Sequence, residues 1–188
     1  MSKKKFFHKL YKFHEKSKTY LIEVSLDDYD EIYDDWDPSP FKKRDIEPEF
    51  NDFIVNSSED IPLNFKIGIV LYLPSSKKDE KKEATLISAY QNYYDYVIEK
   101  LNRSKSTLNG KIIFNLLFSM SLLFIGYGSS GDDGNIFINV FKEGIFIGGW
   151  VFLWDFFTTI FFTKRELRNQ YKLYKRLYNA DINFIYLD

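Results

Sequence analysis

Two long apolar runs dominate the pattern of hydrophobic and polar positions along this chain. Residues 112–127 carry no charge, and residues 144–162 carry one, Asp155. The second run has the length of a membrane-spanning helix, and the first, 16 residues long, is near the lower limit. We therefore predict a two-helix transmembrane hairpin with spans at about 112–128 and 144–162. A hairpin buried inside a soluble protein is the alternative.

Shorter patterned runs on either side of the hairpin predict a small sheet. In residues 19–26, Tyr20 and Ile22 alternate with more polar side chains, as in a strand with one buried face. Residues 66–73 are apolar on both faces and predict a central strand. Residues 182–187 predict a third strand, which returns to the same sheet because a lone terminal strand would leave its edge unpaired.

Helical spacing predicts the helices that accompany this three-stranded sheet. Acidic residues at the start of a helix are favourable, which predicts one at about 47–56. Apolar side chains recur at helical spacing over about 77–105 and again over 164–178. The fold class is therefore α+β, with a cytoplasmic sheet, amphipathic helices and a hairpin inserted before the last strand. The predicted parts are a basic amphipathic segment (1–18), an α+β domain (19–110), the transmembrane hairpin (111–163), and a helix and strand that complete the sheet (164–188).

Basic residues flank both spans and predict the orientation of the hairpin. Residues 128–135, between the spans, contain Asp132 and Asp133 and no base. Positive charges near membrane spans mark the cytoplasmic side. We therefore predict a protein of the inner membrane with both termini in the cytoplasm. The lipid bilayer is thus the first expected partner. The flanking bases are Lys100, Arg103, Lys105, Lys111, Lys164, Arg165 and Arg168.

Small and polar residues on one face of each span predict how the spans pack. In the second span, Gly144 and Gly148 form a GxxxG pair, and Asp155 continues that face. Counted from the cytoplasmic ends at about 1.5 Å per residue, Asp155 lies at the depth of Ser119, and Gly148 at the depth of Gly126. The predicted packing residues are Asn115, Ser119, Gly126, Gly144, Gly148 and Asp155.

Asp155 requires a partner inside the membrane, because an ionised carboxylate that faces lipid costs several kcal/mol. Three interpretations stay open. The carboxylate can accept hydrogen bonds from Ser119 and Asn115 within the hairpin, face another copy in a homo-oligomer or conducting assembly, or take part in a proton relay.

An acidic run without any base occupies residues 27–37. It has no glycine for the turn of a calcium loop, and spacing alone does not place acids as a two-metal nuclease needs them. The run is either a solvated segment paired with the basic N-terminus, a divalent-ion site, or a docking surface for a basic protein partner. Its acids are Asp27, Asp28, Asp30, Glu31, Asp34, Asp35 and Asp37.

The basic segment 1–18 interleaves seven lysines with apolar and aromatic side chains. This is typical of an interfacial helix held by anionic lipid headgroups, at about 1 kcal/mol per lysine. We expect lipid rather than nucleic acid as its partner because a membrane lies close by. We expect His8 and His14 to be surface residues.

Catalytic and cofactor signatures are missing from the sequence. With no Cys and two His, thiolate and histidine-rich metal centres are excluded. There is no phosphate loop, dinucleotide fingerprint or nucleophile elbow. We therefore predict no cofactor and no catalytic residue. The leading hypothesis is a membrane-anchored interaction or sensing module; the alternatives are an oligomerising membrane-perturbing effector and a membrane-tethered enzyme of unrecognised type.

A proline-containing segment follows the acidic run and predicts a recognition loop or a structural connection of fixed shape. Its prolines fix an extended turn, Phe41 can anchor the segment, and Arg44 can pair with Asp45. The loop residues are Trp36, Pro38, Pro40, Phe41, Arg44 and Asp45.

Two motifs carry a resemblance to known proteins. Residues 36–62 begin WDPSPFKKRDI, and residues 142–154 read KEGIFIGGWVFLW. Together they resemble a group of uncharacterised bacterial membrane proteins with a D-P-S-P-F…R-D-[LI] segment and an E-G…G-W-V-x-x-W segment. Where those proteins have a basic residue and a proline after the second Trp, this chain has Asp155 and Phe156. The resemblance implies a bacterial inner-membrane protein and no particular activity.

Overall fold

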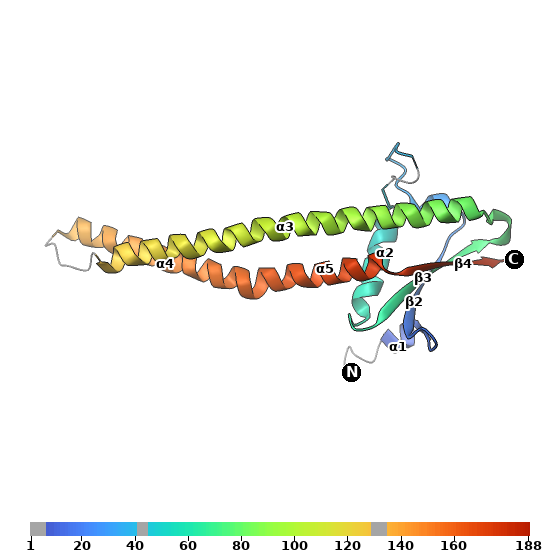
Figure 1. Cartoon of the computed structure of the whole chain (residues 1–188), viewed down its shortest axis with the longest axis horizontal. Coiled ribbons are helices and arrows are strands. Elements are labelled where there is room, and N and C mark those ends of the chain that lie inside the picture. The colour runs from blue at the N-terminus through green and yellow to red at the C-terminus, as the bar shows by residue number, and fades with distance from the viewer. Residues whose placement is uncertain (1–6, 41–44, 129–134) are drawn as a thin grey trace. The chain divides into compact units, whose positions relative to one another are not determined.

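The chain forms two compact units in the computed structural model, which describes residues 7–40, 45–128 and 135–188 (Figure 1). The first unit, here the sheet unit, comprises Met1–Glu99 and Gln170–Asp188. The second, here the hairpin unit, comprises Lys100–Asn169. The sheet unit is therefore built from segments that precede and follow the hairpin unit in sequence.

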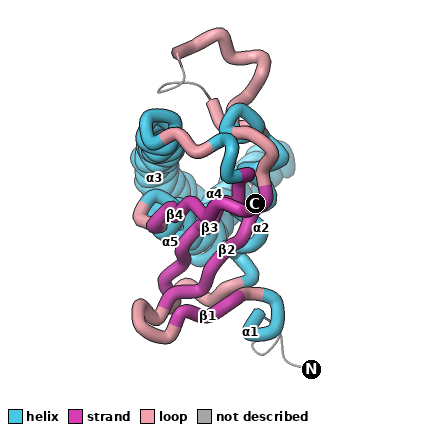
Figure 2. The backbone as a smooth tube through the Cα atoms, turned by 90° about the vertical axis from the view of Figure 1, so that its right-hand side faces the viewer, coloured by secondary structure: helices cyan, strands magenta, loops and turns pink. Residues whose placement is uncertain are grey.

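A four-stranded sheet forms the centre of the sheet unit (Figure 2). The strand order is β1-β2-β3-β4, with β1 antiparallel to β2 and the other three strands parallel. The predicted mixed α and β structure is confirmed, but the sheet has four strands where we predicted three. The strands are β1 (Lys12–His14), β2 (Thr19–Ser25), β3 (Lys66–Pro74) and β4 (Asp181–Leu187).

The fourth strand comes from the N-terminal segment, which we predicted to be an interfacial helix. Its described part forms α1 (Phe7–Leu10) and then β1. Phe7 is buried, with its ring 5.2 Å from that of Tyr20 and 5.9 Å from that of Phe65. An aromatic ring that packs into the core in this way does not face lipid, so the interfacial-helix prediction is wrong for this stretch.

Besides α1, three longer helices contribute to the described part of the sheet unit. They are α2 (Pro48–Asp60), the first part of α3 (Glu80–Gly128) and the last part of α5 (Lys164–Tyr178). Helix α2 has proline at its first position, where the missing N–H costs nothing. Short 3₁₀ turns, η2 (Tyr29–Ile32) and η3 (Ser75–Lys77), follow β2 and β3.

One face of the sheet packs on these helices and forms the core. The strand register aligns Ile22, Ile69 and Ile182 on this face, and the next row aligns Val24, Leu71 and Phe184. Because side chains alternate along a strand, the intervening residues occupy the opposite face. The helical residues in the core are Phe50, Ile54, Leu86, Ala89, Tyr90, Tyr94, Leu173 and Leu177.

Hydrogen bonds from Arg176 connect α5 to the C-terminal end of α2 and the turn that follows it. Its Nη1 donates to the carbonyls of Ile61 at 2.9 Å and Pro62 at 3.1 Å, and its Nη2 donates to Ser58 Oγ at 2.7 Å and to the Ser58 carbonyl. Burial lowers the pKa of Arg176 to about 10. No carboxylate among the described residues pairs with Arg176. Carbonyls at a helix C-terminus carry partial negative charge, which compensates the charge of the guanidinium.

The hairpin unit contains two helices long and apolar enough to cross a membrane. They belong to α3 and to the continuous helical stretch Ile136–Tyr178, which comprises α4 (Ile136–Thr158), a π-turn η4 (Thr159–Thr163) and α5. Only 11% of the most apolar window of each helix is buried inside the structure. The core helix of a soluble protein would bury most of such a window, so this apolar surface is left for another environment.

Candidate functional site

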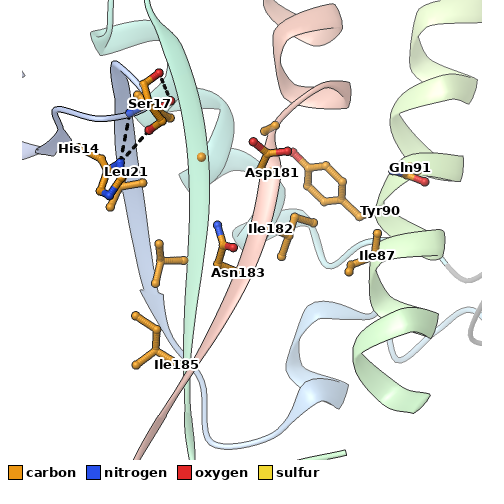
Figure 3. A pocket seen from close by; sticks show the side chains of 14 residues that line it. His14, Ser17, Leu21, Ile87, Tyr90, Gln91, Asp181, Ile182, Asn183 and Ile185 are labelled. Atoms are coloured by element: carbon orange, nitrogen blue, oxygen red, sulfur yellow. Dashed lines mark hydrogen bonds between the residues drawn. The ribbon is translucent and has the colours of Figure 1, made fainter. Parts of the chain in front are cut away.

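A hollow of about 670 Å³ runs along β4 (Figure 3). On one side of the strand it is lined by Ile87, Tyr90 and Gln91 of α3, and on the other by residues of β1, β2 and β3 and the turn between β1 and β2. Because β4 is an edge strand, a hollow that touches both of its faces passes its free edge. The lining residues from the sheet are His14, Ser17, Thr19, Leu21, Gly68, Val70, Asp181, Ile182, Asn183 and Ile185.

The hollow continues onto the face of the sheet that the helices do not cover. There Leu21, Gly68 and Asp181 form one row of the register, and the adjacent row contains Val70 and Asn183. None of these residues belongs to the hydrophobic core cluster, but Gly68 and Val70 of the central strand are buried among their neighbours, with Val70 4% exposed. Strands β2, β3 and β4 are parallel, and sheets of parallel strands are almost always covered on both faces. The exposed residues of this face, Asp181 and Asn183, therefore belong to a surface that a further element can complete.

Gly68 shapes the floor of the hollow. A Cβ atom at this position would lie 3.3 Å from Leu21 Cδ2 and 3.4 Å from Thr19 Cγ2. These contacts are tight, and any larger side chain would also fill the space above the sheet. Glycine inside a strand otherwise weakens it and often marks a close approach of another group. Gly68, a glycine inside an otherwise apolar strand, is the sequence signal that points to this surface.

Some polar side chains beside the hollow pair with each other, and others are exposed to solvent. Lys12 Nζ lies 2.7 Å from Glu23 Oε1, and the Tyr72 hydroxyl donates to the same oxygen at 2.5 Å. Burial works to raise the pKa of Glu23, but the hydrogen bonds from Lys12 and Tyr72 lower it overall. Asp181 and Asn183 are exposed, and no Lys or Arg is among the lining residues that the structure describes.

The acidic run shapes a loop rather than forming a charged cluster. Asp28 caps η2 by accepting from the Tyr29 N–H at 2.7 Å, and Glu31 accepts from the N–H groups of Asp27 and Asp28 at 3.0 and 3.2 Å. Among the residues that the structure describes, no group of three or more acids or histidines could hold a metal ion. Of the three interpretations, the divalent-ion site therefore finds no support in the geometry.

Asp28 pairs with lysines before and within α3, and no described lysine of the N-terminal segment forms an ion pair with it. Its carboxylate lies 2.6 Å from Lys77 Nζ and 3.6 Å from Lys82 Nζ. The hydrogen bond from Lys77 holds the pKa of Asp28 below its usual value. At the same carboxyl ends of the strands, Tyr186 donates to Glu83, and burial followed by this hydrogen bond raises the pKa of Tyr186.

The predicted recognition loop is closed at its base and exposes Trp36. An isolated bridge pairs Tyr33 with Ile46, and the Asp34 N–H donates to the Asp45 carbonyl at 2.9 Å. Asp34 also accepts from the Trp36 N–H at 2.8 Å, while the Trp36 side chain is 93% exposed.

The rest of the predicted loop is only partly described. Pro38 and Pro40 lie in its described part, whereas Phe41 and Arg44 lie outside the described residues. Asp37 accepts from the N–H groups of Ser39 at 2.9 Å and Asp45 at 2.8 Å. Asp30 and Asp35 are exposed.

In the hairpin unit, Asp155 meets Asn115 but not Ser119. Asn115 Nδ2 donates to Asp155 Oδ2 at 2.5 Å, and Lys111 Nζ lies 3.0 Å from the same oxygen. Ser119 is fully buried and donates instead to the Leu116 carbonyl at 2.9 Å. Asp155 therefore lies about one helical turn away from the predicted position beside Ser119. It is paired with Lys111, whose charge we predicted only to orient the hairpin.

Close packing in the hairpin uses Gly126 and Gly149. A Cβ on Gly126 would lie 2.9 Å from Phe146 Cβ, and one on Gly149 would lie 2.8 Å from Leu123 Cγ. By contrast, a Cβ on Gly144 would meet nothing within 4 Å, and one on Gly148 would make an ordinary contact with Leu122 at 3.8 Å. In the structure the close contacts between the two helices thus lie at Gly126 and Gly149, and not at Gly144 or Gly148.

Comparisons with protein-family models, with curated proteins and with solved structures find no match for this chain. The functional argument is therefore based on the geometry described above.

Proposed function

We propose that the chain is a membrane-anchored interaction or sensing module. The hairpin unit holds the protein in the inner membrane, and the sheet unit binds a partner in the cytoplasm. The observation that carries this proposal is the contrast between the two units: the apolar windows of the hairpin helices are 11% buried, whereas the sheet unit has a closed core.

The orientation follows from how the sheet unit is built. Strands before and after the hairpin unit belong to one sheet, so both flanks of the hairpin must lie on the same side of any bilayer that it crosses. The bases of the flanks favour the cytoplasmic side for that unit. The lysines of residues 1–18 add attraction to anionic lipid headgroups.

Two surfaces of the sheet unit can receive a partner. The first is the loop with Trp36, whose exposed indole is the kind of side chain that anchors protein interfaces, with the acids Asp34, Asp35 and Asp37 beside it. The second is the uncovered face of the sheet. Binding does not require catalytic residues, and in our proposal the protein has no enzymatic activity.

Fractionation and proximity labelling test this proposal. The protein should stay with membranes after carbonate extraction and enter solution only with detergent. A labelling enzyme fused before residue 7 should mark cytoplasmic proteins, and Trp36→Ala should remove a defined subset of them. Trp154→Ala, which changes an exposed Trp of the hairpin unit, is the matched control. Recovery of the chain in the soluble fraction without detergent would refute the membrane anchor.

Asp155 supports an assembling effector as a second candidate. Both of its contacts use Oδ2, so Oδ1 has no partner among the described residues, although the side chain is 43% exposed. A second copy could supply a donor to that oxygen within the membrane. Asp155→Leu should then convert an oligomer into a monomer in detergent, and overexpression of the unmodified chain should depolarise cells. A monomer before and after the substitution would eliminate this candidate.

A further inference from the structure

The sheet unit has a free edge whose surroundings are shaped for one more strand. β4 is seven residues long and, among the residues that the structure describes, pairs with β3 alone. Its outer edge therefore presents a row of unpaired N–H and C=O groups, which natural proteins usually protect by charge, proline or a covering element. Between Asp181 and Leu187 the strand contains no proline and no lysine.

The exposed side chains of β4 make this edge more apolar than a protected edge. Ile185 is 40% exposed and Leu187 is 53% exposed. Both lie on the uncovered face of the sheet, two residues apart, so they point the same way. An exposed, apolar edge strand that is not defended in this way is a template for pairing with another chain.

The hollow along β4 has the form that an added strand requires. It touches Asn183 and Ile185 on the uncovered face of the strand and Ile182 on the other face, with Ile87 and Gln91 of α3 beyond (Figure 3). A strand alongside β4 would direct alternate side chains to these two sides. A compact ligand would contact only one of the two sides of β4, whereas an added strand contacts both.

We propose that the β4 edge binds an extended segment of a partner protein, which adds a fifth strand to the sheet. The segment has alternating apolar residues and carries Lys or Arg at its ends. This proposal deepens the proposed function by naming the chemistry of the partner, and it rests on that function. Recognition by strand addition takes affinity from backbone hydrogen bonds and specificity from alternate side chains.

The charges around the edge select a basic segment. Asp181 begins β4 and Asp188 follows it, with Ser75 Oγ donating to Asp188 Oδ1 at 2.8 Å. No Lys or Arg is among the described residues that line the hollow. Lys78 Nζ lies 5.6 Å from the ring centroid of Tyr186, on the face of β4 that packs on the helices. The two acids disfavour a second copy of the chain as the occupant. Two antiparallel β4 strands centred on Phe184 would place Asp181 of one copy opposite Leu187 of the other and next to its Asp188, at both ends, and like charges on paired strands are destabilising.

A peptide selection on the full chain in nanodiscs tests the proposal. A displayed library of random 12-residue peptides should yield binders with alternating apolar residues and basic ends. Asp181→Lys should weaken such a peptide at least tenfold, and replacement of its basic ends by Glu should restore binding to that variant. Asp95→Lys, the same charge change on an exposed residue of α3 outside the hollow, should leave affinity within twofold.

Backbone methylation distinguishes strand addition from side-chain docking. A strand beside β4 bonds through one edge only, so N-methylation of one alternate set of peptide residues should abolish binding and methylation of the other set should not. The proposal is overturned if no peptide is enriched, if methylation of either set of residues has the same effect on affinity, or if Asp181→Lys leaves the affinity unchanged. It is also overturned if the protein alone forms a dimer that Ile185→Lys disrupts.

These outcomes are separate from those of the proposed function. Peptides that respond to Trp36→Ala but not to Asp181→Lys would refute the β4 site and leave the interaction module in place. Loss of the protein from membranes would refute the anchor without affecting peptide binding to β4.

Discussion

Single side chains decide how the sheet unit is held together, and Arg176 is the clearest case. Its guanidinium has no carboxylate partner in the described part of the chain and makes four hydrogen bonds to acceptors at the end of α2 and in the following turn. Within the same described residues, its buried Nε has no hydrogen-bond partner. The planar guanidinium contributes more to the stability of this contact than a positive charge alone would, because its two terminal nitrogens donate to different carbonyls at the same time.

We predict that Arg176→Met lowers the free energy of unfolding of the sheet unit by about 2–3 kcal/mol, because hydrogen bonds from charged groups contribute about 1.5–3 kcal/mol. Arg176→Lys should recover only part of this loss. Chemical denaturation followed by tyrosine fluorescence measures the change. Lys172→Met, at an exposed position of α5, is the control and should change stability by less than about 0.5 kcal/mol. Equal effects of the two methionine variants would contradict the prediction.

The paired carboxylates predict how stability depends on acid pH. Glu23 and Asp28 both have pKa values below their usual ones because lysines donate to them. Their stabilising contribution is therefore complete above the unfolded pKa, about 4, and is lost as the pH falls through the lower folded values. The melting temperature of the detergent-solubilised chain should drop as the pH falls below about 4, and less steeply for Glu23→Gln. A slope that is unchanged by Glu23→Gln would exclude this carboxylate as the source.

At the scale of elements, the hairpin depends on where two helix backbones approach. Gly126 and Gly149 face bulky side chains at distances that leave no room for a Cβ, whereas Gly144 faces open space. The three glycines thus provide two test positions and a matched control within one hairpin unit.

We predict that Gly149→Val and Gly126→Val each weaken helix pairing by about 1–3 kcal/mol, as overpacking does, and that Gly144→Val has no such effect. Pairing can be measured by disulfide formation between Phe118→Cys and Phe152→Cys, since these rings lie 4.8 Å apart and the chain has no native Cys. Slower crosslinking with Gly144→Val than with Gly149→Val would show that the observed register is not the one in the membrane.

Much of the element plan could be predicted from the sequence because long apolar runs and the fully apolar strand β3 are strong signals. β1 could not, since three residues contain too little alternation to be distinguished from a helix. The hairpin register was misjudged because depth was counted along two regular helices of equal extent. The π-turn η4 alters that count in the second span, and the salt bridge from Lys111 fixes the position of Asp155. The β4 hollow depends on strands brought together from distant segments, which no local pattern reveals.

At the scale of the whole molecule, all residues of the hydrophobic core cluster belong to the sheet unit. Its last helix and strand follow the hairpin unit in sequence, yet Leu173 and Leu177 belong to the same core as Leu86 and Tyr90. The rings of Tyr94 and Tyr174 lie 6.1 Å apart, so the chain leaves and re-enters this unit at neighbouring points.

We predict that the sheet unit folds without the hairpin unit. Replacement of Lys100–Asn169 by a Gly/Ser linker of about ten residues, with a reach of about 17 Å, should give a soluble protein with cooperative unfolding. The same protein without Asp181–Asp188 should be unfolded, because β3 would lose its partner. Circular dichroism and thermal melts test both. Aggregation of the first protein under conditions that keep the full chain folded in detergent would contradict the division into two units.

Because β4 follows both apolar helices in sequence, the order of synthesis limits when the sheet can form. When the ribosome has translated β3, the strand that must lie beside it has not yet been made, and both apolar helices emerge first. In the membrane-anchored protein that we propose, the nascent sheet can therefore close only after the hairpin has reached the insertion machinery. A chain that stalls or is cleaved within the hairpin would expose the incomplete edge of β3, which gives quality-control proteases a direct mark of failed insertion.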